Sequence, residues 1–188
     1  MSVYNWGGTA AEHARRYPCD DYLPRPNVRI TRAITVHAPA ATVYRWFCQI
    51  SIAPYSYDLI DNRGRRSPRR LVPGADALVV GQRVGVFRLV DIEPGRQFSG
   101  VFHPAARRVF GPGAGTYAAE PIDTASCRLL CRFVLSRSGL GRLRAPLLAA
   151  GDLVMVRKQF HTFKALAERD AARGERGDGA SSGTRRHG

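Results

Sequence analysis

The feature that most restricts the fold of this chain is an alternation of apolar and polar residues over 126–136. The apolar positions form one unbroken face of Cys127, Leu129, Cys131, Phe133 and Leu135. A period of two predicts a strand with one buried face, because successive side chains of a strand point to opposite sides of a sheet. We expect Cys127 and Cys131 to pack as small apolar side chains, since their C-x3-C spacing is not a usual zinc signature. Arg128 and Arg132 lie on the other face, and we expect them to contact solvent.

Three more strand-like segments precede this one at short spacing. They cover residues 83–93, closed by a Pro-Gly pair, residues 97–103, closed by Pro104, and residues 116–122, after a glycine-rich stretch. Short loops between neighbouring strands favour antiparallel pairing. The pattern predicts an antiparallel meander whose apolar face needs a cover.

A strand and a helix are predicted ahead of the meander. Residues 29–37 alternate, with Ile30, Ile34 and Val36 as the apolar positions. Residues 39–50 have helical spacing and place Val43, Trp46, Phe47 and Ile50 on one face. Residues 51–76 form a long polar connection that contains three prolines.

The last helix is the best candidate to cover the meander. Over 153–169 it carries an apolar stripe of Leu153, Val156, Phe160, Phe163 and Ala167, and Asp152 is suited to be its N-cap. The element order predicts an α+β domain in which a curved antiparallel sheet packs on a long C-terminal helix. We expect one such domain over 28–170, preceded by an extended arm over 1–27 and followed by a disordered, glycine-rich tail over 171–188.

The net charge of +14 raises the question of nucleic-acid binding. All basic residues except Lys158 and Lys164 are arginine, and they are scattered apart from one cluster of Arg63, Arg65, Arg66, Arg69 and Arg70. That cluster has no interleaved aromatic residues on which bases could stack. We therefore expect no nucleic-acid partner, although the charge favours loose attraction to anionic surfaces.

The first twenty residues contain no apolar run, so we expect no signal peptide and a cytoplasmic protein. No stretch approaches the roughly 20 apolar residues that span a bilayer, and no motif indicates a metal or a cofactor. The oligomeric state is open.

Several short motifs, taken in order, resemble the SRPBCC superfamily. They are RAITV at 32–36 with Ala38-Pro39, VYRW at 43–46 with Gln49, YSYD at 55–58 with Asp61-Asn62, Gly81-Gln82, and EPGR at 93–96. WGGT at 6–9 and PCD at 18–20 resemble an uncharacterised bacterial branch of it. The superfamily includes START domains, polyketide cyclases and birch-pollen-allergen-like proteins. The resemblance implies a helix-grip fold, β-α-α-β6-α, with an internal cavity beneath the last helix.

Candidate ligand-binding residues follow from where the resemblance places the cavity. They are Trp46, Tyr55, Tyr57, Asp58, Met155, Gln159, Phe160 and Phe163. Tyrosines suit a pocket rim, because each pairs an apolar ring with a polar hydroxyl. The competing interpretations are that Tyr57 and Asp58 anchor their segment, that Trp46 is core, and that Gln159 lies at the helix edge in water.

Three functions remain open at this stage. The first is binding of a small hydrophobic ligand, lipid-like or polyketide-like, in the cavity. The second is an enzyme of the polyketide cyclase/dehydratase type that uses a pocket Tyr or Asp for proton transfer. The third is an interaction module whose basic loop at 63–70 binds an acidic partner. None of the five histidines is spaced with a carboxylate or nucleophile as a catalytic pair would be.

Overall fold

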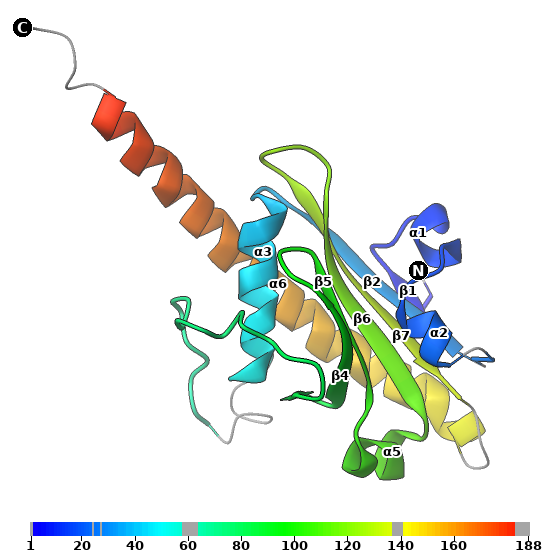
Figure 1. The fold of residues 1–188 in the computed structure, drawn as a ribbon. Coiled ribbons are helices and arrows are strands. Elements are labelled where there is room, and N and C mark those ends of the chain that lie inside the picture. The colour runs from blue at the N-terminus through cyan, green and yellow to red at the C-terminus, as the bar shows by residue number, and fades with distance from the viewer. Residues whose placement is uncertain (1, 24, 27, 58–63, 137–140, 183–188) are drawn as a thin grey trace, which may run out of the picture.

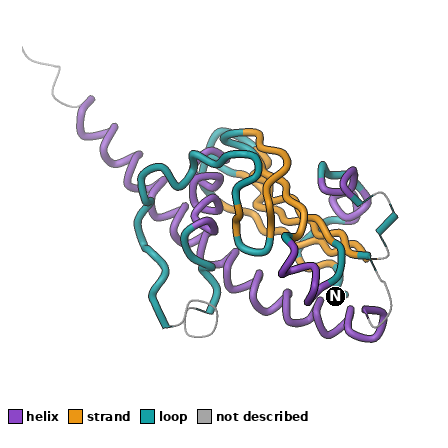
Figure 2. Tube along the Cα trace, turned by 60° about the horizontal axis from the view of Figure 1, so that its bottom comes forward, coloured by secondary structure: helices purple, strands orange, loops and turns teal. Residues whose placement is uncertain are grey.

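A computed structural model describes the chain except residues 1, 24, 27, 58–63, 137–140 and 183–188 (Figure 1). Within the described residues, one sheet has seven strands in the order β1-β2-β7-β6-β5-β4-β3. Only the β1–β2 pair is parallel, and every other neighbouring pair is antiparallel. The long helix α6 runs along this sheet (Figure 2). The predicted α+β class, with a sheet packed against a long C-terminal helix, is confirmed.

The strands are β1 (Asn5–Trp6), β2 (Val28–Val36), β3 (Arg83–Val84), β4 (Phe87–Glu93), β5 (Gln97–Phe102), β6 (Gly113–Pro121) and β7 (Cys127–Leu135). The alternation at 29–37 and 126–136 identified the adjacent pair β2 and β7, in which Ile30 lies opposite Phe133. The single strand expected at 83–93 is instead the hairpin of β3 and β4. It turns at Gly85, whose φ of +56° is a conformation that other residues adopt only with strain.

The helices are α1 (Ala10–Ala14), α2 (Cys19–Tyr22), α3 (Ala40–Cys48), the 3-10 turn η1 (Gln49–Ser51), α5 (Pro104–Phe110) and α6 (Gly141–Ser182). α6 begins before Asp152, so the N-cap prediction is wrong and Asp152 lies inside the helix. The residues ahead of Asp152 are rich in Leu and Ala, which favour helix strongly enough to continue it through Gly151. α6 also continues to Ser182, through most of the segment expected to be a disordered tail.

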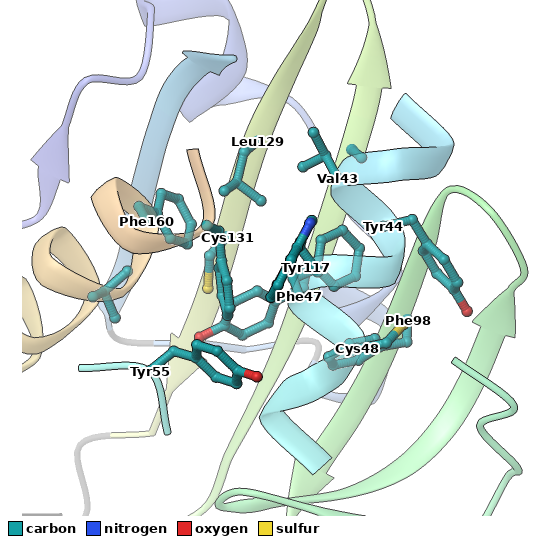
Figure 3. Packing of buried hydrophobic residues seen from close by; sticks show 14 of the residues in the cluster. Val43, Tyr44, Phe47, Cys48, Tyr55, Phe98, Tyr117, Leu129, Cys131 and Phe160 are labelled. Atoms are coloured by element: carbon teal, nitrogen blue, oxygen red, sulfur yellow. The ribbon is translucent and has the colours of Figure 1, made fainter. Parts of the chain in front are cut away.

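The main core lies between the sheet and the two helices α3 and α6. Figure 3 shows Val43 and Phe47 of α3 and Phe160 of α6 beside Leu129 and Cys131 of β7. The apolar face predicted for β7 therefore points toward the helices, as expected. Cys127 and Cys131 are buried free thiols within this core.

The N-terminal arm covers the opposite face of the sheet, where α1 and α2 pack over a second, smaller apolar cluster (Figure 1). Arg132 is 0% exposed there, so the prediction that it faces solvent is wrong. Its Nη2 donates to the carbonyl oxygens of Glu12 at 2.8 Å, His13 at 2.7 Å and Arg15 at 3.2 Å. The guanidinium thus satisfies carbonyl groups at the end of α1 that have no partner inside the helix. It also lies 5.0 Å from the ring centroid of Tyr17.

None of the helices in the described part of the chain is both long and apolar enough to cross a membrane.

Candidate functional site: an apolar cavity with a buried ion pair

A cavity of about 740 Å³ lies between the sheet, α6 and the segment that follows η1. Its sheet wall is largely aromatic and includes Phe87, Phe98, Phe102, Tyr117 and Phe133. The segment after η1 contributes apolar residues such as Ile52 and Pro54, and α6 contributes Asp152, Met155, Val156 and Gln159. Such a volume matches the usual size of a site for a small organic ligand.

Glycines in the middle strands allow the aromatic wall to form. A Cβ on Gly115 would lie 2.6 Å from ring atoms of both Phe87 and Phe133. These two rings stack beside the backbone of Gly115, which has no side chain, with centroids 5.7 Å apart and planes at 13°. The wall therefore consists of rings lying close against the sheet, which leaves space between them and α6.

A chain of two hydrogen bonds at the cavity begins on the sheet. The hydroxyl of Tyr117 donates to Oε1 of Gln159 at 3.0 Å, and Nε2 of Gln159 donates to the carbonyl oxygen of Pro54 at 2.5 Å. The chain connects β6, α6 and the segment after η1. Burial raises the pKa of Tyr117 well above 10, so its phenol stays protonated and remains a donor.

An ion pair between Arg32 and Asp152 also lies at the cavity. Arg32 lies in the middle of β2 and is 0% exposed, and its Nη2 is 3.0 Å from Oδ2 of Asp152. The same guanidinium donates to the carbonyl oxygens of Val3 at 2.9 Å, Ala149 at 3.0 Å and Thr31 at 3.2 Å. Arg32 is therefore held in place by backbone as well as by Asp152.

Asp152 is the one carboxylate among the described residues that line the cavity. Its Oδ2 is buried beside Arg32 without a well-aligned hydrogen bond, yet a quarter of its side chain is exposed. The exposed part therefore belongs to the rest of the side chain, which includes Oδ1. Burial raises the pKa of Asp152 to about 6, and the positive charge of Arg32 opposes that rise only in part.

Neither member of this pair was among the candidate site residues from the sequence. Asp152 was interpreted as a helix cap, and Arg32 only as part of a motif. A signal for Arg32 was present, because it occupies an even, inward position of the alternation between Ile30 and Ile34. A charged residue at an inward position of a strand needs a buried partner, and only the structure identifies that partner.

Of the candidate residues from the sequence, Met155 and Gln159 line the cavity. Gln159 points inward and is nearly buried, rather than lying at the helix edge in water. Met155 is partly exposed and lies where the cavity opens.

Four other candidates belong to the packed core and do not line the cavity: Trp46, Tyr55, Phe160 and Phe163. The ring of Tyr55 packs 5.3 Å from that of Phe163 and 6.3 Å from that of Trp46. Nε1 of Trp46 donates to Oδ2 of Asp170 at 3.1 Å. Tyr55 thus packs on a ring from α3 and on a ring from α6, within the core rather than at the cavity.

The two remaining candidates are Tyr57 and Asp58. Tyr57 is 40% exposed and does not line the cavity, and Asp58 lies outside the described residues. In the arginine cluster, Arg63 is likewise outside them, whereas Arg65, Arg66, Arg69 and Arg70 are exposed.

Among the residues that the structure describes, no three His, Cys, Asp or Glu side chains are grouped so that they could hold a metal ion. The four cysteines are all buried, and desolvation raises the pKa of each, which makes them poor nucleophiles. The polar side chains that line the cavity within the described residues are Ser56, Tyr117, Asp152 and Gln159, and they supply the chemistry available there.

No protein-family model matches the chain, and no curated protein matches it. The comparison with solved structures finds similar chains. One is a protein from Thermobifida fusca, solved by NMR, with 15% identity over 73% of this chain and 94% of that chain and a TM-score of 0.49. A point mutant of norcoclaurine synthase from Thalictrum flavum has 14% identity over 71% of this chain and 94% of that chain, with a TM-score of 0.40. An aromatase/cyclase from a Streptomyces species has 14% identity over 77% and 93%, with a TM-score of 0.43.

Proposed function

We propose that this protein binds a small hydrophobic molecule in the cavity between the sheet and α6. The observation that carries the proposal is a cavity of about 740 Å³ with mostly apolar walls beside a close-packed core. Larger side chains that filled such a space would stabilise the fold, because protein interiors are otherwise packed like organic crystals. The space is therefore best explained by a ligand.

Hydrophobic burial would supply most of the affinity. A ligand of about 20 non-hydrogen atoms at about −0.3 kcal/mol per atom gains roughly −6 kcal/mol, which corresponds to a Kd of tens of micromolar. Met155 and Gln159 would contact the ligand directly. The rings of Trp46, Tyr55 and Phe163 would support the wall from behind.

The proposal can be tested by filling the cavity from α6. Val156 lines the cavity, whereas Val154, two residues away on the same helix, is 54% exposed and does not. We expect Val156→Phe to weaken binding of a hydrophobic fluorescent probe at least about tenfold, because the added ring occupies the ligand's space. Val154→Phe should leave the affinity unchanged. Equal binding by the wild type and Val156→Phe would contradict the proposal.

The pKa and the position of Asp152 support a second candidate function, that of an enzyme of the cyclase or dehydratase type. A carboxyl group with a pKa of about 6 can accept and return a proton near neutral pH, and this one faces an apolar cavity. With a ketone in the cavity, its carboxylate would remove a proton from the carbon next to the carbonyl to give an enolate. The same carboxyl group would then return a proton to that carbon.

This reaction has a direct readout in deuterated water. We expect the wild type to accelerate deuterium incorporation next to the carbonyl of 2-tetralone, observed by NMR, and Asp152→Asn to lose the acceleration. Exchange at the rate of buffer alone would leave binding as the function. Retained acceleration in Asp152→Asn would exclude Asp152 as the base.

A further inference from the structure

We infer that the molecule bound in the cavity is apolar over most of its length and carries one hydrogen-bond donor, a hydroxyl or an amine, that reaches Oδ1 of Asp152. The inference rests on the proposed binding function and specifies the chemical class of its ligand.

The polar groups of the sheet and of α6 differ in whether they are already paired. Tyr117 donates to Gln159, and Gln159 donates to the carbonyl oxygen of Pro54. These two hydrogen bonds join β6, α6 and the segment after η1. Among the described residues, the only partner of the Asp152 side chain is Arg32, which lies at Oδ2. Its side chain therefore retains hydrogen-bonding capacity on the side that faces the cavity.

The pair of Arg32 and Asp152 favours a ligand that carries a hydrogen-bond donor over a ligand that is an anion. An ionised carboxylate only accepts hydrogen bonds, so it is complementary to an O–H or N–H group. Arg32 is 0% exposed and lies behind Asp152, where three carbonyl oxygens and Oδ2 surround its guanidinium. A ligand carboxylate would meet the negative charge of Asp152 without reaching the cation, and two like charges in an apolar site repel each other.

The ionisation of Asp152 controls this preference. The titratable or charged groups that face it are Arg32 from β2, Tyr117 from β6 and Cys131 from β7. Burial raises the pKa of Tyr117 and that of Cys131 well above their ordinary values, so both stay neutral. Near neutral pH the change of charge therefore occurs at Asp152, and the preference for a donor should weaken as the pH falls below about 6.

A matched set of probes tests the inference. 4-Hexylphenol and 4-hexylanisole share one skeleton, but only the phenol donates a hydrogen bond, and 4-hexylbenzoate is an anion. At about pH 7.5, isothermal titration calorimetry should show the phenol binding at least about tenfold more tightly than the anisole, as expected for a hydrogen bond to a charged group. The benzoate should bind more weakly than the anisole.

Two variants assign the preference to its residue. Asp152→Asn should bring the phenol and the anisole to within about threefold of each other while anisole binding persists, because the amide lacks the charge that strengthens the hydrogen bond. Glu168→Gln is the matched control, since Glu168 lies on the same helix but pairs with Lys164 and does not line the cavity. If Asp152→Asn does not fold, the wild type titrated at about pH 5 should show the same reduced preference.

The outcomes separate this inference from the function on which it rests. If none of the three probes binds, the binding function fails. Equal binding of phenol and anisole to the wild type would leave the function standing and overturn the inference. Tightest binding of the benzoate would also overturn it, because the cavity would then select anions.

A separate observation concerns the surface around the opening of the cavity. Ile52, Phe110 and Met155 line the cavity and are each more than a third exposed, and Val109 next to Phe110 is 64% exposed. Arg107 and Arg108 are exposed on the same short helix, α5. The opening therefore combines apolar side chains with positive charge.

We further propose that this opening docks on an anionic lipid surface. Cations near such a surface are attracted to it, with about 1 kcal/mol for each Arg or Lys, and exposed apolar side chains gain by entering the boundary of the acyl chains. An acidic protein would complement the arginines equally well. A lipid surface in addition supplies an apolar phase for Phe110 and Val109 and a source for an apolar ligand.

Vesicle sedimentation tests this proposal. We expect binding to phosphatidylcholine vesicles that contain phosphatidylglycerol, weaker binding to phosphatidylcholine alone, and at least about a fivefold loss in Phe110→Ser. Val109→Ser gives the same test at a more exposed side chain. Ile122→Ser is the control, because Ile122 is 55% exposed at the opposite end of β6 from α5. Equal effects of Phe110→Ser and Ile122→Ser, or no effect of either α5 variant, would overturn the proposal.

Discussion

Replacement of Phe160 by alanine tests whether the rings of the packed core, rather than the residues that line the cavity, stabilise the fold. Phe160 is 0% exposed, with ring centroids 6.2 Å from Tyr117 and 6.5 Å from Trp6. Truncation removes the transfer free energy of the ring and leaves a void, and such changes cost about 3–5 kcal/mol. We expect about 4 kcal/mol, because the hydrogen bond from Tyr117 to Gln159 keeps its ring from moving into the space.

The assay is urea unfolding followed by circular dichroism. With an m-value of about 2 kcal/mol/M, Phe160→Ala should lower the midpoint by about 2 M. Met155→Ala is the control, because Met155 is 39% exposed at the opening and its truncation should cost less than about 1 kcal/mol while weakening ligand binding. A midpoint shift below about 0.5 M in Phe160→Ala would refute the interpretation that α6 is held by this core.

Three other predictions address the arm, the ion pair and the sheet. Arg132→Met should release the arm, so hydrogen exchange should rise at least about tenfold in α1 and change little in β7, and equal exchange in both would contradict this. Because the pKa of Asp152 rises from 3.8 to about 6 on folding, the folded state binds more protons between these values. Its contribution to the free energy of unfolding should therefore fall by about 2 kcal/mol between pH 4 and pH 6. Urea melts of the wild type and Asp152→Asn at both pH values measure this contribution as the difference between the two proteins. Gly115→Ala should cost about 1–3 kcal/mol, because its Cβ meets the ring of Phe133 at 2.6 Å, and a neutral effect would show that the wall adapts.

The fold was largely predictable from local patterns. The alternation at 29–37 and 126–136 identified β2 and β7, and the apolar stripe identified the part of α6 that packs on the sheet. These predictions succeed because the periodicity of side chains reports which face of an element is buried. The hairpin of β3 and β4 was not predicted, since one glycine at positive φ interrupts a continuous apolar run.

The positions of the candidate site residues were less predictable. Aromatic residues on α6 were expected to line a cavity, but Phe160 and Phe163 pack in the core, and Met155 and Gln159 face the space. All four lie within a few turns of one helix, so the choice depends on how that helix is rotated against the sheet. A helical stripe does not specify that rotation to within one residue.

The sequence by itself determined the long strands, the covering helix and the apolar faces that pack between them, because these follow from periodicities within single elements. Tertiary structure alone decided that Arg132 is buried under the arm and that Arg32 meets Asp152 at the cavity. Both arginines lie on strands, and their partners are distant in the chain. A buried charge is stable only where such partners converge on it. That convergence is a property of the packed elements, and no single segment of the sequence contains it.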